Sequence, residues 1–249
     1  MELTFLGTGA AFAGDANNAG YILDRRVLID AGAPVHVLIH QTGHDIGAIE
    51  AVVITHQHAD HTFGLPYVMA TRAIEAPSAR PFTIAGPPGF EAYIEKLFVL
   101  AWGQKLKAMV WERLRPTFVE LTPGRDSEVA GFAVHTERMV HVDDFICNGY
   151  HFYRDGVSFA FSGDTTDCPG LRALVELSDY VLMEMTATME GDPSHLSLAQ
   201  ARAIVAANPG KRFFLTHLNR RQLYYVEQGD VEGAERAADL TTVELAPRS

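Results

Sequence analysis

The chain has 249 residues, 47% of them hydrophobic, and a formal net charge of −11. This length allows a substantial buried core, and we expect one domain over residues 1–249. The acidic balance opposes binding to nucleic-acid backbones. The sequence contains no run of eighteen apolar residues, so we expect no membrane-spanning helix.

The N-terminus and the cysteine content indicate a reducing compartment. The first residues, MELTFLGTGA, lack the basic region and apolar core of a signal peptide. Cys147 and Cys168 are too few for a disulfide framework and lack zinc-finger spacing. We therefore expect a cytoplasmic protein whose two thiols are reduced.

The first half of the chain predicts several strands and then helices. Apolar alternation or β-branched content predicts strands at ELTFLG, GYIL, RVLID and AVVIT, with the middle two joined as a hairpin. A helix is expected from about Leu65 to Ile74, and PFTIAG is the next strand. A longer helical region follows from Pro88 to Leu114, with a break near Gly103.

The second half repeats this order. The expected strands are FAVHTERMVH, GYHFYR, VSFAFSGD, YVLMEM and RFFLTH, and the expected helices are CPGLRALVEL, LSLAQARAIVAAN and VEGAERAADL. Each half is rich in strands first and in helices later, and each carries ligand-type residues at strand ends. This organisation predicts two β-sheets packed face to face with helices outside.

The segment THQHADH places His56, His58, Asp60 and His61 within six positions, directly after the strand AVVIT. Two imidazoles spaced i, i+2 on a loop can face one divalent cation. Asp60 and His61 continue the turn and can serve a second cation, since two-metal hydrolytic sites hold their ions about 3.5–4 Å apart. This concentration of ligand-type side chains predicts a metal site.

The same segment resembles the His-x-His-x-Asp-His signature of the metallo-β-lactamase superfamily. Further residues of that ligand set appear in order: His141 in MVHVDD, Asp164 in FSGDT and His217 in LTHLN. The resemblance spans FLGTG to LTHLNRR and implies an α/β fold, the αββα four-layer sandwich of two mixed sheets between helices.

The resemblance also implies a division of these residues between two ions. His56, His58 and His141 would hold the first ion, and Asp60, His61 and His217 would hold the second. Asp164 would bridge them. Zinc is the first expectation for both ions, and manganese and iron are alternatives because nitrogen and oxygen donors suit all three.

Several stretches resemble the ribonuclease Z and phosphodiesterase branch in particular. They are FLGTG, NNAGYIL, LIDAG, THQHADHTFGLP and LTHLNRRQ. VLMEMT followed by HLSLAQA is similar to that branch's glutamate and His-Ser-Thr helix start, which makes Glu184 and His195 candidate catalytic residues. His195 would protonate a leaving oxygen while Glu184 orients its ring.

Two departures from the branch bear on the substrate. A tRNA-processing ribonuclease Z carries a long basic arm between the third histidine and the bridging aspartate, and only 22 residues separate His141 from Asp164. The cysteines that hold a structural zinc in phosphonate-pathway cyclic phosphodiesterases are absent from GTGAAFAGDANNAG. We therefore expect a small-molecule substrate and neither tRNA nor a membrane as a partner, while members of this family often form dimers, so a homodimer stays open.

We expect a dinuclear phosphodiesterase that acts on a small or cyclic phosphodiester. The two cations would lower the pKa of a bridging water, and Asp60 is a candidate acceptor of its proton. Expected pocket walls are Phe63, Phe145 and the helix from Phe90 to Trp102.

Other activities share the ligand set and stay open. Lactonases, arylsulfatases and thioesterases have this fold, and a metal-loaded binding or sensing protein is the non-catalytic alternative. True metallo-β-lactamases lack the bridging aspartate, and flavodiiron proteins place glutamate where His58 stands. Asp164 and His58 therefore count against those two classes.

Overall fold

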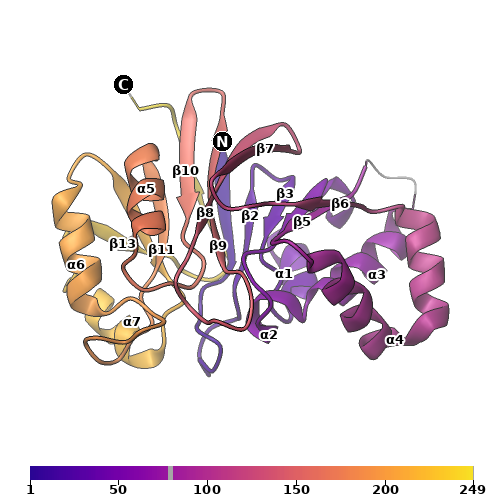
Figure 1. The fold of residues 1–249 in the computed structure, drawn as a ribbon, viewed down its shortest axis with the longest axis horizontal. Helices are drawn as coiled ribbons and strands as arrows, with labels where there is room; N and C mark the ends of the chain where they lie inside the picture. Colours follow the sequence, from indigo (N-terminus) through magenta and orange to yellow (C-terminus); the bar gives the residue numbers. More distant parts are fainter. Residues whose placement is uncertain (78–80, 249) are drawn as a thin grey trace.

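The computed structural model describes residues 1–77 and 81–248. Two β-sheets pack face to face, and helices cover the outer face of each sheet. The layers can be followed in Figure 1, where helices of the first half of the chain lie to the right of the strands and those of the second half to the left. The expected αββα four-layer sandwich is therefore confirmed.

Within the described residues each sheet has seven strands, with antiparallel neighbours at one end and parallel neighbours at the other. In spatial order the first sheet contains β14 (Thr241–Glu244), β1 (Glu2–Gly7), β2 (Gly20–Leu23), β3 (Val27–Ile29), β4 (Ala51–Val53), β5 (Thr83–Gly86) and β6 (Thr117–Glu120). The second contains β13 (Ala234–Arg236), β12 (Arg212–Thr216), β11 (Tyr180–Glu184), β10 (Val157–Phe161), β9 (Asn148–Arg154), β8 (Phe132–Arg138) and β7 (Arg125–Val129).

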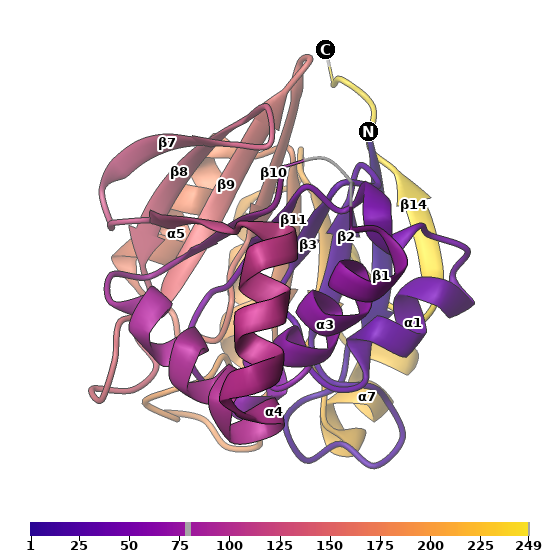
Figure 2. The ribbon, with the colours of Figure 1, turned by 90° about the vertical axis from the view of Figure 1, so that its right-hand side faces the viewer.

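The helices divide between the two halves of the chain. The first half contributes α1 (Val35–Gln41), a 3-10 turn (Ile46–Ala48), α2 (Ala59–Thr62), α3 (Leu65–Glu75) and α4 (Phe90–Leu114), and Figure 2 views the side that α3 and α4 cover. The second half contributes α5 (Pro169–Leu177), α6 (Leu198–Ala207) and α7 (Arg220–Glu227). In the described part of the chain, no helix combines the length and apolar character needed to cross a bilayer.

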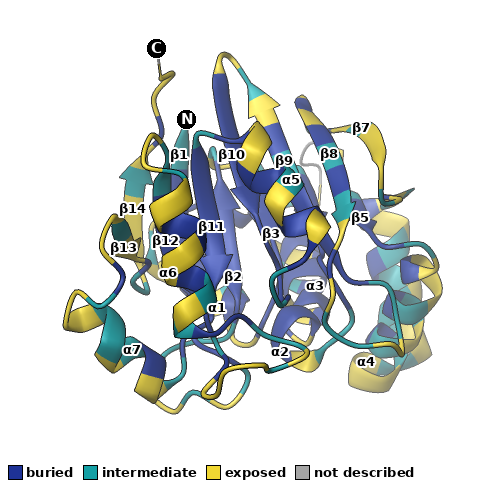
Figure 3. Ribbon diagram, turned by 60° about the vertical axis from the view of Figure 1, so that its left-hand side comes forward, coloured by how far each residue is buried: buried dark blue, intermediate teal, exposed yellow. Residues whose placement is uncertain are grey.

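Both faces of the central strands are buried, as Figure 3 shows for the dark blue strands behind the yellow outer surfaces of the helices. Successive side chains of a strand point to opposite faces. In β2, Tyr21 and Leu23 therefore join the core between the sheets, while Ile22 joins the core beneath the helices. This double burial explains why the strands are almost continuously apolar.

The two sheets meet closely where β4 and β10 end. The backbone N–H of Asn148 donates to the Thr55 carbonyl at 3.0 Å, and the hydroxyl of Tyr150 donates to the Ile54 carbonyl at 2.7 Å. Gly163, at φ 58°, lies where a Cβ would come within 3.0 Å of the Thr55 side chain. A glycine is needed here because of both this backbone angle and this close approach.

Most of the predicted elements are present, but the helix predicted over VEGAERAADL is wrong. Gly233 has φ 84°, and Ala234–Arg236 instead form β13, which pairs with β12 at the edge of the second sheet. Glu235 and Arg212 form an ion pair at 2.6 Å across these strands. Strand pairing thus prevails over the helical propensity of this alanine-rich and glutamate-rich segment.

Other elements also differ from the sequence-based expectation, which did not include the strands β6, β7 and β14. The strand FAVHTERMVH ends at Arg138, so His141 lies on the loop that follows. Helix α7 was not predicted. Its N-cap is Asn219, whose side-chain oxygen accepts hydrogen bonds from the backbone N–H groups of Arg221 and Gln222.

The packing between the sheets predicts a large cost for truncating Phe214. This buried ring lies 5.5 Å from the ring of Phe5 on the opposite sheet. Phe214→Ala should lower the free energy of unfolding by about 3–5 kcal/mol, measured by urea denaturation in the presence of a chelator. Tyr153→Ala, which truncates a half-exposed ring of the second sheet, should change it by less than about 1 kcal/mol. Equal effects of the two variants would contradict this assignment of the core.

Candidate metal centre

The expected ligand residues follow the ends of strands from both sheets. β4 leads into His56, β10 into Asp164 and β12 into His217. The carboxyl ends of β10, β11 and β12 meet at one edge because these strands are parallel. The structure brings all seven expected residues together there: His56, His58, Asp60, His61, His141, Asp164 and His217.

Local hydrogen bonds hold the histidine loop in shape. The backbone N–H of His61 donates to the carbonyl of His58 at 3.1 Å, and the hydroxyl of Thr62 donates to the same carbonyl at 2.8 Å. The hydroxyl of Tyr93, from α4, donates to the Gln57 carbonyl at 2.8 Å and lies 2.8 Å from the Thr62 hydroxyl. Helix α4 therefore supports the loop from outside.

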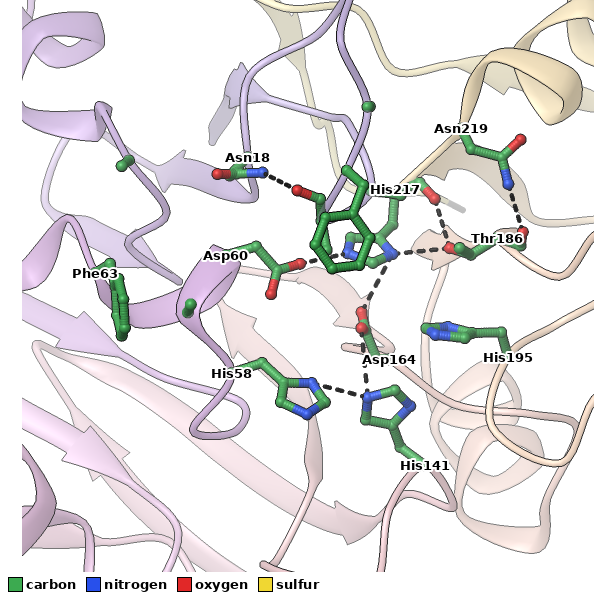
Figure 4. A pocket seen from close by; sticks show the side chains of 16 residues that line it. Asn18, His58, Asp60, Phe63, His141, Asp164, Thr186, His195, His217 and Asn219 are labelled. Carbon is green, nitrogen blue, oxygen red and sulfur yellow. Dashed lines mark hydrogen bonds and ion pairs between the residues drawn. The ribbon is translucent and has the colours of Figure 1, made fainter.

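Four residues form a first cluster: His56, His58, His141 and Asp164. The Nδ1 atom of His58 lies 3.0 Å from Nε2 of His56 and 3.1 Å from Nε2 of His141 (Figure 4 shows His58 and His141). The other ring nitrogen of His141 lies 2.9 Å from the Ser194 carbonyl, which fixes it as the N–H donor and leaves Nε2 as a ligand atom. Three imidazole nitrogens therefore converge on one point.

A second cluster contains Asp60, His61, Asp164 and His217. The Oδ2 atom of Asp60 lies 3.1 Å from Nε2 of His217 and 3.4 Å from Nε2 of His61. His61 Nε2 is buried and has no hydrogen-bond partner among the described residues. A buried ring nitrogen is rarely left without a partner, so this atom fits a position facing a cation.

Asp164 lies between the two clusters. Its Oδ2 atom is 3.8 Å from Nε2 of His56 and 3.7 Å from Nε2 of His141, both in the first cluster. Its Oδ1 atom is 3.4 Å from Nε2 of His61 and 3.5 Å from Nδ1 of His217, both in the second. One carboxylate thus faces both clusters with different oxygens, as a bridging ligand does.

The protonation states in the first cluster suit a cation. Burial, the largest influence, lowers the pKa of His56 far below its usual value, and it also lowers the pKa of His58. Burial opposes ionisation of Asp164, but His217 and His61 hold the pKa of that carboxyl well below its usual range. His56 and His58 therefore offer neutral imidazoles and Asp164 offers an ionised carboxylate, which are the forms that bind metal.

The second cluster requires positive charge. Burial lowers the pKa of His61, but the carboxylates of Asp164, Asp30 and Asp60 outweigh burial and raise it well above its usual value. Carboxylates buried so closely around one imidazole need a cation, which is either a proton or a metal ion. Together the two clusters fit the dinuclear site typical of this ligand set.

Asp30 supports this site and was not singled out from the sequence. Its fully buried carboxylate accepts a hydrogen bond from the Thr55 backbone N–H at 2.8 Å and lies 2.7 Å from Nδ1 of His61. The bond to Nδ1 turns Nε2 of His61 toward the cluster. The available signal was LIDAG, where an aspartate ends an otherwise apolar strand.

Glu184 and His195 form a pair beside the two clusters. Oε1 of the buried Glu184 lies 2.7 Å from Nδ1 of His195, and the carboxylate also accepts the backbone N–H groups of Thr165 and Thr186. Burial lowers the pKa of His195, but Glu184 outweighs burial and raises it to about 9. His195 is therefore a protonated imidazole near neutral pH, and its ring lies 4.7 Å from that of His141.

Thr186 and Asn219 hold His217 in place, and neither was expected from the sequence. The Thr186 hydroxyl lies 2.8 Å from Nδ1 of His217 and donates to the His217 carbonyl. The Asn219 side chain donates to the Thr186 carbonyl at 2.7 Å (Figure 4). His217 has φ 54°, a left-handed angle uncommon for a residue with a side chain, and these contacts support it.

A pocket of about 580 Å³ opens over the clusters. Phe63 is one of its walls, as expected. Phe90, Trp102 and Phe145 are not among its lining residues, so that part of the expectation is wrong. Trp102 contacts Tyr67 on the outer side of the sheet, and Phe145 lies against the rings of His56 and His58. The N-terminal loop forms the remaining apolar wall, including Phe12.

Comparison with known proteins supports the same fold and branch. A family model described as Anti-Pycsar protein Apyc1 matches residues 1–236. Ribonuclease Z from Bacillus licheniformis is 27% identical over an alignment of 279 positions, which covers 89% of each chain. Ribonuclease Z from Lactobacillus helveticus is 34% identical over 149 residues; the match covers 57% of this chain and spans less than half (45%) of that protein.

A solved structure shows the shared fold. The metallo-β-lactamase fold protein YhfI from Bacillus subtilis superposes with a TM-score of 0.77 at 15% identity, covering 97% of this chain and 98% of that one. The ribonuclease Z relatives confirm the resemblance to the ribonuclease Z and phosphodiesterase branch of the metallo-β-lactamase superfamily.

The role of Asp30 predicts a loss of metal affinity on its replacement. Asp30→Asn should weaken zinc binding at the second cluster by about ten- to a hundredfold, because the amide supports His61 Nε2 less well as a ligand. Competition with a chromophoric chelator measures this. Asp126→Asn is the matched control, since Asp126 also pairs with a histidine, His135 at 2.6 Å, but on the surface. Unchanged affinity in Asp30→Asn, or an equal loss in both variants, would contradict the prediction.

Proposed function

The chain belongs to the family of the anti-Pycsar protein Apyc1, and from this membership we propose a dinuclear metal-dependent phosphodiesterase for a small or cyclic phosphodiester. The observation that carries the proposal is the position of Asp164, whose two oxygens face separate clusters. One carboxylate shared by two clusters supports two ions a few ångströms apart, the arrangement of two-metal hydrolysis. The wider assignment, a metal-dependent hydrolase of the metallo-β-lactamase superfamily, agrees with its ribonuclease Z relatives.

We assign the ligands by cluster. His56, His58 and His141 would hold one ion, Asp60, His61 and His217 the other, and Asp164 both. Imidazole-rich donor sets favour zinc, while manganese and iron remain compatible with them. Bound there, two divalent cations would activate water and stabilise negative charge on phosphoryl oxygens.

The chain's own residues supply the proton for the leaving group. His195 is held by Glu184 through Nδ1, so the proton on Nε2 is the one available to the pocket. We propose that this proton passes to the leaving oxygen as the phosphorus–oxygen bond breaks. For Asp60, burial is outweighed by His61 and His217, which hold its pKa well below the usual range; this favours the ligand role over that of a general base.

The shape of the chain favours a small substrate over tRNA. Strands β9 and β10 occupy much of the segment between His141 and Asp164, so this segment forms no extended arm. The pocket volume of about 580 Å³ lies within the range of small-molecule sites. A net charge of −11 further opposes a polyanionic partner.

Substrate preference is the first test. The zinc-reconstituted protein should hydrolyse bis(p-nitrophenyl) phosphate with a higher kcat/KM than an aryl sulfate, a homoserine lactone or a thioester. Asp164→Ala should lose at least one bound ion and nearly all of this turnover, as measured by elemental analysis and steady-state kinetics. Asp167→Asn, which replaces a partly buried aspartate paired with the exposed Arg172, is the matched control and should retain both.

The outcomes separate the alternatives. Efficient lactone, sulfate or thioester turnover without phosphodiester cleavage would reassign the activity within the fold. No turnover of any of these compounds by a fully zinc-loaded protein would favour the binding or sensing alternative. Full metal content and activity in Asp164→Ala would contradict the proposed metal site, in which Asp164 is shared by two ions.

Leaving-group dependence tests the role of His195. His195→Gln should lower kcat by about 10²–10⁴-fold for a phosphodiester with an alkyl leaving group, which needs a proton to depart. The loss should be much smaller for p-nitrophenyl esters, because nitrophenolate departs unprotonated. Zinc content should be unchanged. An equal loss for both esters, or loss of zinc, would instead indicate a structural role.

A further inference from the structure

The loop between β1 and β2 places a fully exposed aromatic ring at the mouth of the pocket. Phe12 is 100% exposed, yet it belongs to the same pocket lining as Asp164 and His217. A single exposed phenylalanine carries no functional meaning by itself. Phe12 differs from an ordinary exposed phenylalanine because it lies over a charged cluster, on a loop that is held at its base.

One carboxylate holds the base of that loop. Asp239, in the connection between β13 and β14, accepts hydrogen bonds from the backbone N–H and the hydroxyl of Thr8 at 2.9 and 2.7 Å. Its other oxygen accepts the backbone N–H and the side-chain amide of Asn17 at 2.7 and 2.8 Å. These bonds join the residues on either side of the loop 9–16.

Further contacts order the loop between these two residues. The Gly9 N–H donates to the Asn17 carbonyl at 2.8 Å, and the Ala10 N–H donates to the carbonyl of Leu218 at 3.3 Å. Leu218 directly follows His217, so the loop is tied to the chain beside a proposed metal ligand. The Asn18 side chain, which also lines the pocket, donates to the Ala11 carbonyl at 3.3 Å (Figure 4).

The other side of the pocket adds a second ring. Phe63 is 51% exposed, ends helix α2 and lies on the far side of Asp60 from His217 (Figure 4). Ala33 and Ala59 also line this apolar side of the pocket, and their side chains are small. With cations bound at the two clusters, the pocket would have a positively charged floor and apolar, partly aromatic sides, a division suited to a ligand with an anionic group and a flat apolar group.

We propose that Phe12 is a specificity-determining residue that stacks on a planar ring of the substrate, which would be a phosphodiester bearing a nucleobase or an equivalent ring. This inference rests on the proposed function. The π-face of an exposed phenyl group accepts any flat heterocycle and discriminates weakly among bases. Asp239 acts as a positioning residue, because it holds the loop and does not itself face the substrate.

Equilibrium binding tests the stacking directly. Isothermal calorimetry on the zinc-loaded protein would compare AMP with ribose 5-phosphate, which shares the phosphate and sugar but lacks the ring. Phe12→Ala should weaken AMP binding roughly tenfold and change ribose 5-phosphate binding less than twofold. Phe12→Trp, which keeps an aromatic face, should bind AMP within about threefold of wild type.

Two further variants complete the design. Asp239→Asn should weaken AMP binding more than ribose 5-phosphate binding, because a primary amide cannot accept all the hydrogen bonds that the carboxylate accepts. Leu100→Ala, which truncates another highly exposed apolar side chain that does not line the pocket, should leave both affinities unchanged. Thermal unfolding and sedimentation velocity check that all variants fold and keep their association state.

Several results would overturn the inference. They are no measurable binding of AMP to wild type, equal losses of the two ligands in Phe12→Ala, or a change of association state that accounts for the loss. The last result would make Phe12 a self-association contact. Failure of phosphodiester hydrolysis with an intact difference between AMP and ribose 5-phosphate would reject the proposed function while leaving the stacking role in place.

Discussion

Buried negative charge at one edge of the sandwich is the constraint on which the rest of the structure depends. The carboxylates of Asp30, Asp60 and Asp164 are all buried there, and charges removed from water are costly unless they are paired and hydrogen-bonded. Asp30 is satisfied by Thr55 and His61. The other two lie beside His61, and carboxylates buried so closely around one imidazole need a compensating cation, either a proton or a metal ion.

Both halves of the chain must be in place before this site exists. The first sheet delivers the histidine loop, and the second delivers Asp164 and His217 at the ends of its parallel strands. The Tyr150 and Asn148 bonds to the end of β4 fix the two edges against each other. Because a metal ion would bind the assembled edges and not the separated ones, metal binding and sheet packing should stabilise one another.

The sequence identified the candidate metal ligands more completely than the residues that hold those ligands in place. His56 to His61 are adjacent along the chain, and His141, Asp164 and His217 follow in the order of a known signature. Asp30 was missed because its role depends on burial beside His61, which is 31 positions away, and no local pattern encodes that contact. Phe145 was expected in a pocket wall, but tertiary packing places it against imidazoles instead.

The fold was predictable for similar reasons, and its errors lie where tertiary contacts outweigh local preference. Strands buried on both faces, such as VVI and YVL, are apolar enough to recognise. The segment VEGAERAADL has helical composition, yet pairing with β12 and the ion pair of Glu235 with Arg212 make part of it a strand. Helix α7 was hidden because it is only eight residues long and predominantly polar.

The N-terminal loop is held at its base and exposed at its tip, so substitutions at these two places should have different effects. Its hydrogen bonds to Asp239 are made by Thr8 and Asn17, outside the tip, and the tip residue Phe12 does not contribute to the core. Replacement of Phe12 should therefore cost little folding free energy and leave the candidate metal-binding residues in place. If Phe12 stacks on the substrate as proposed, substrate preference would change through substitutions at this exposed tip, and a transplanted loop that keeps both anchor residues would transfer that preference between relatives.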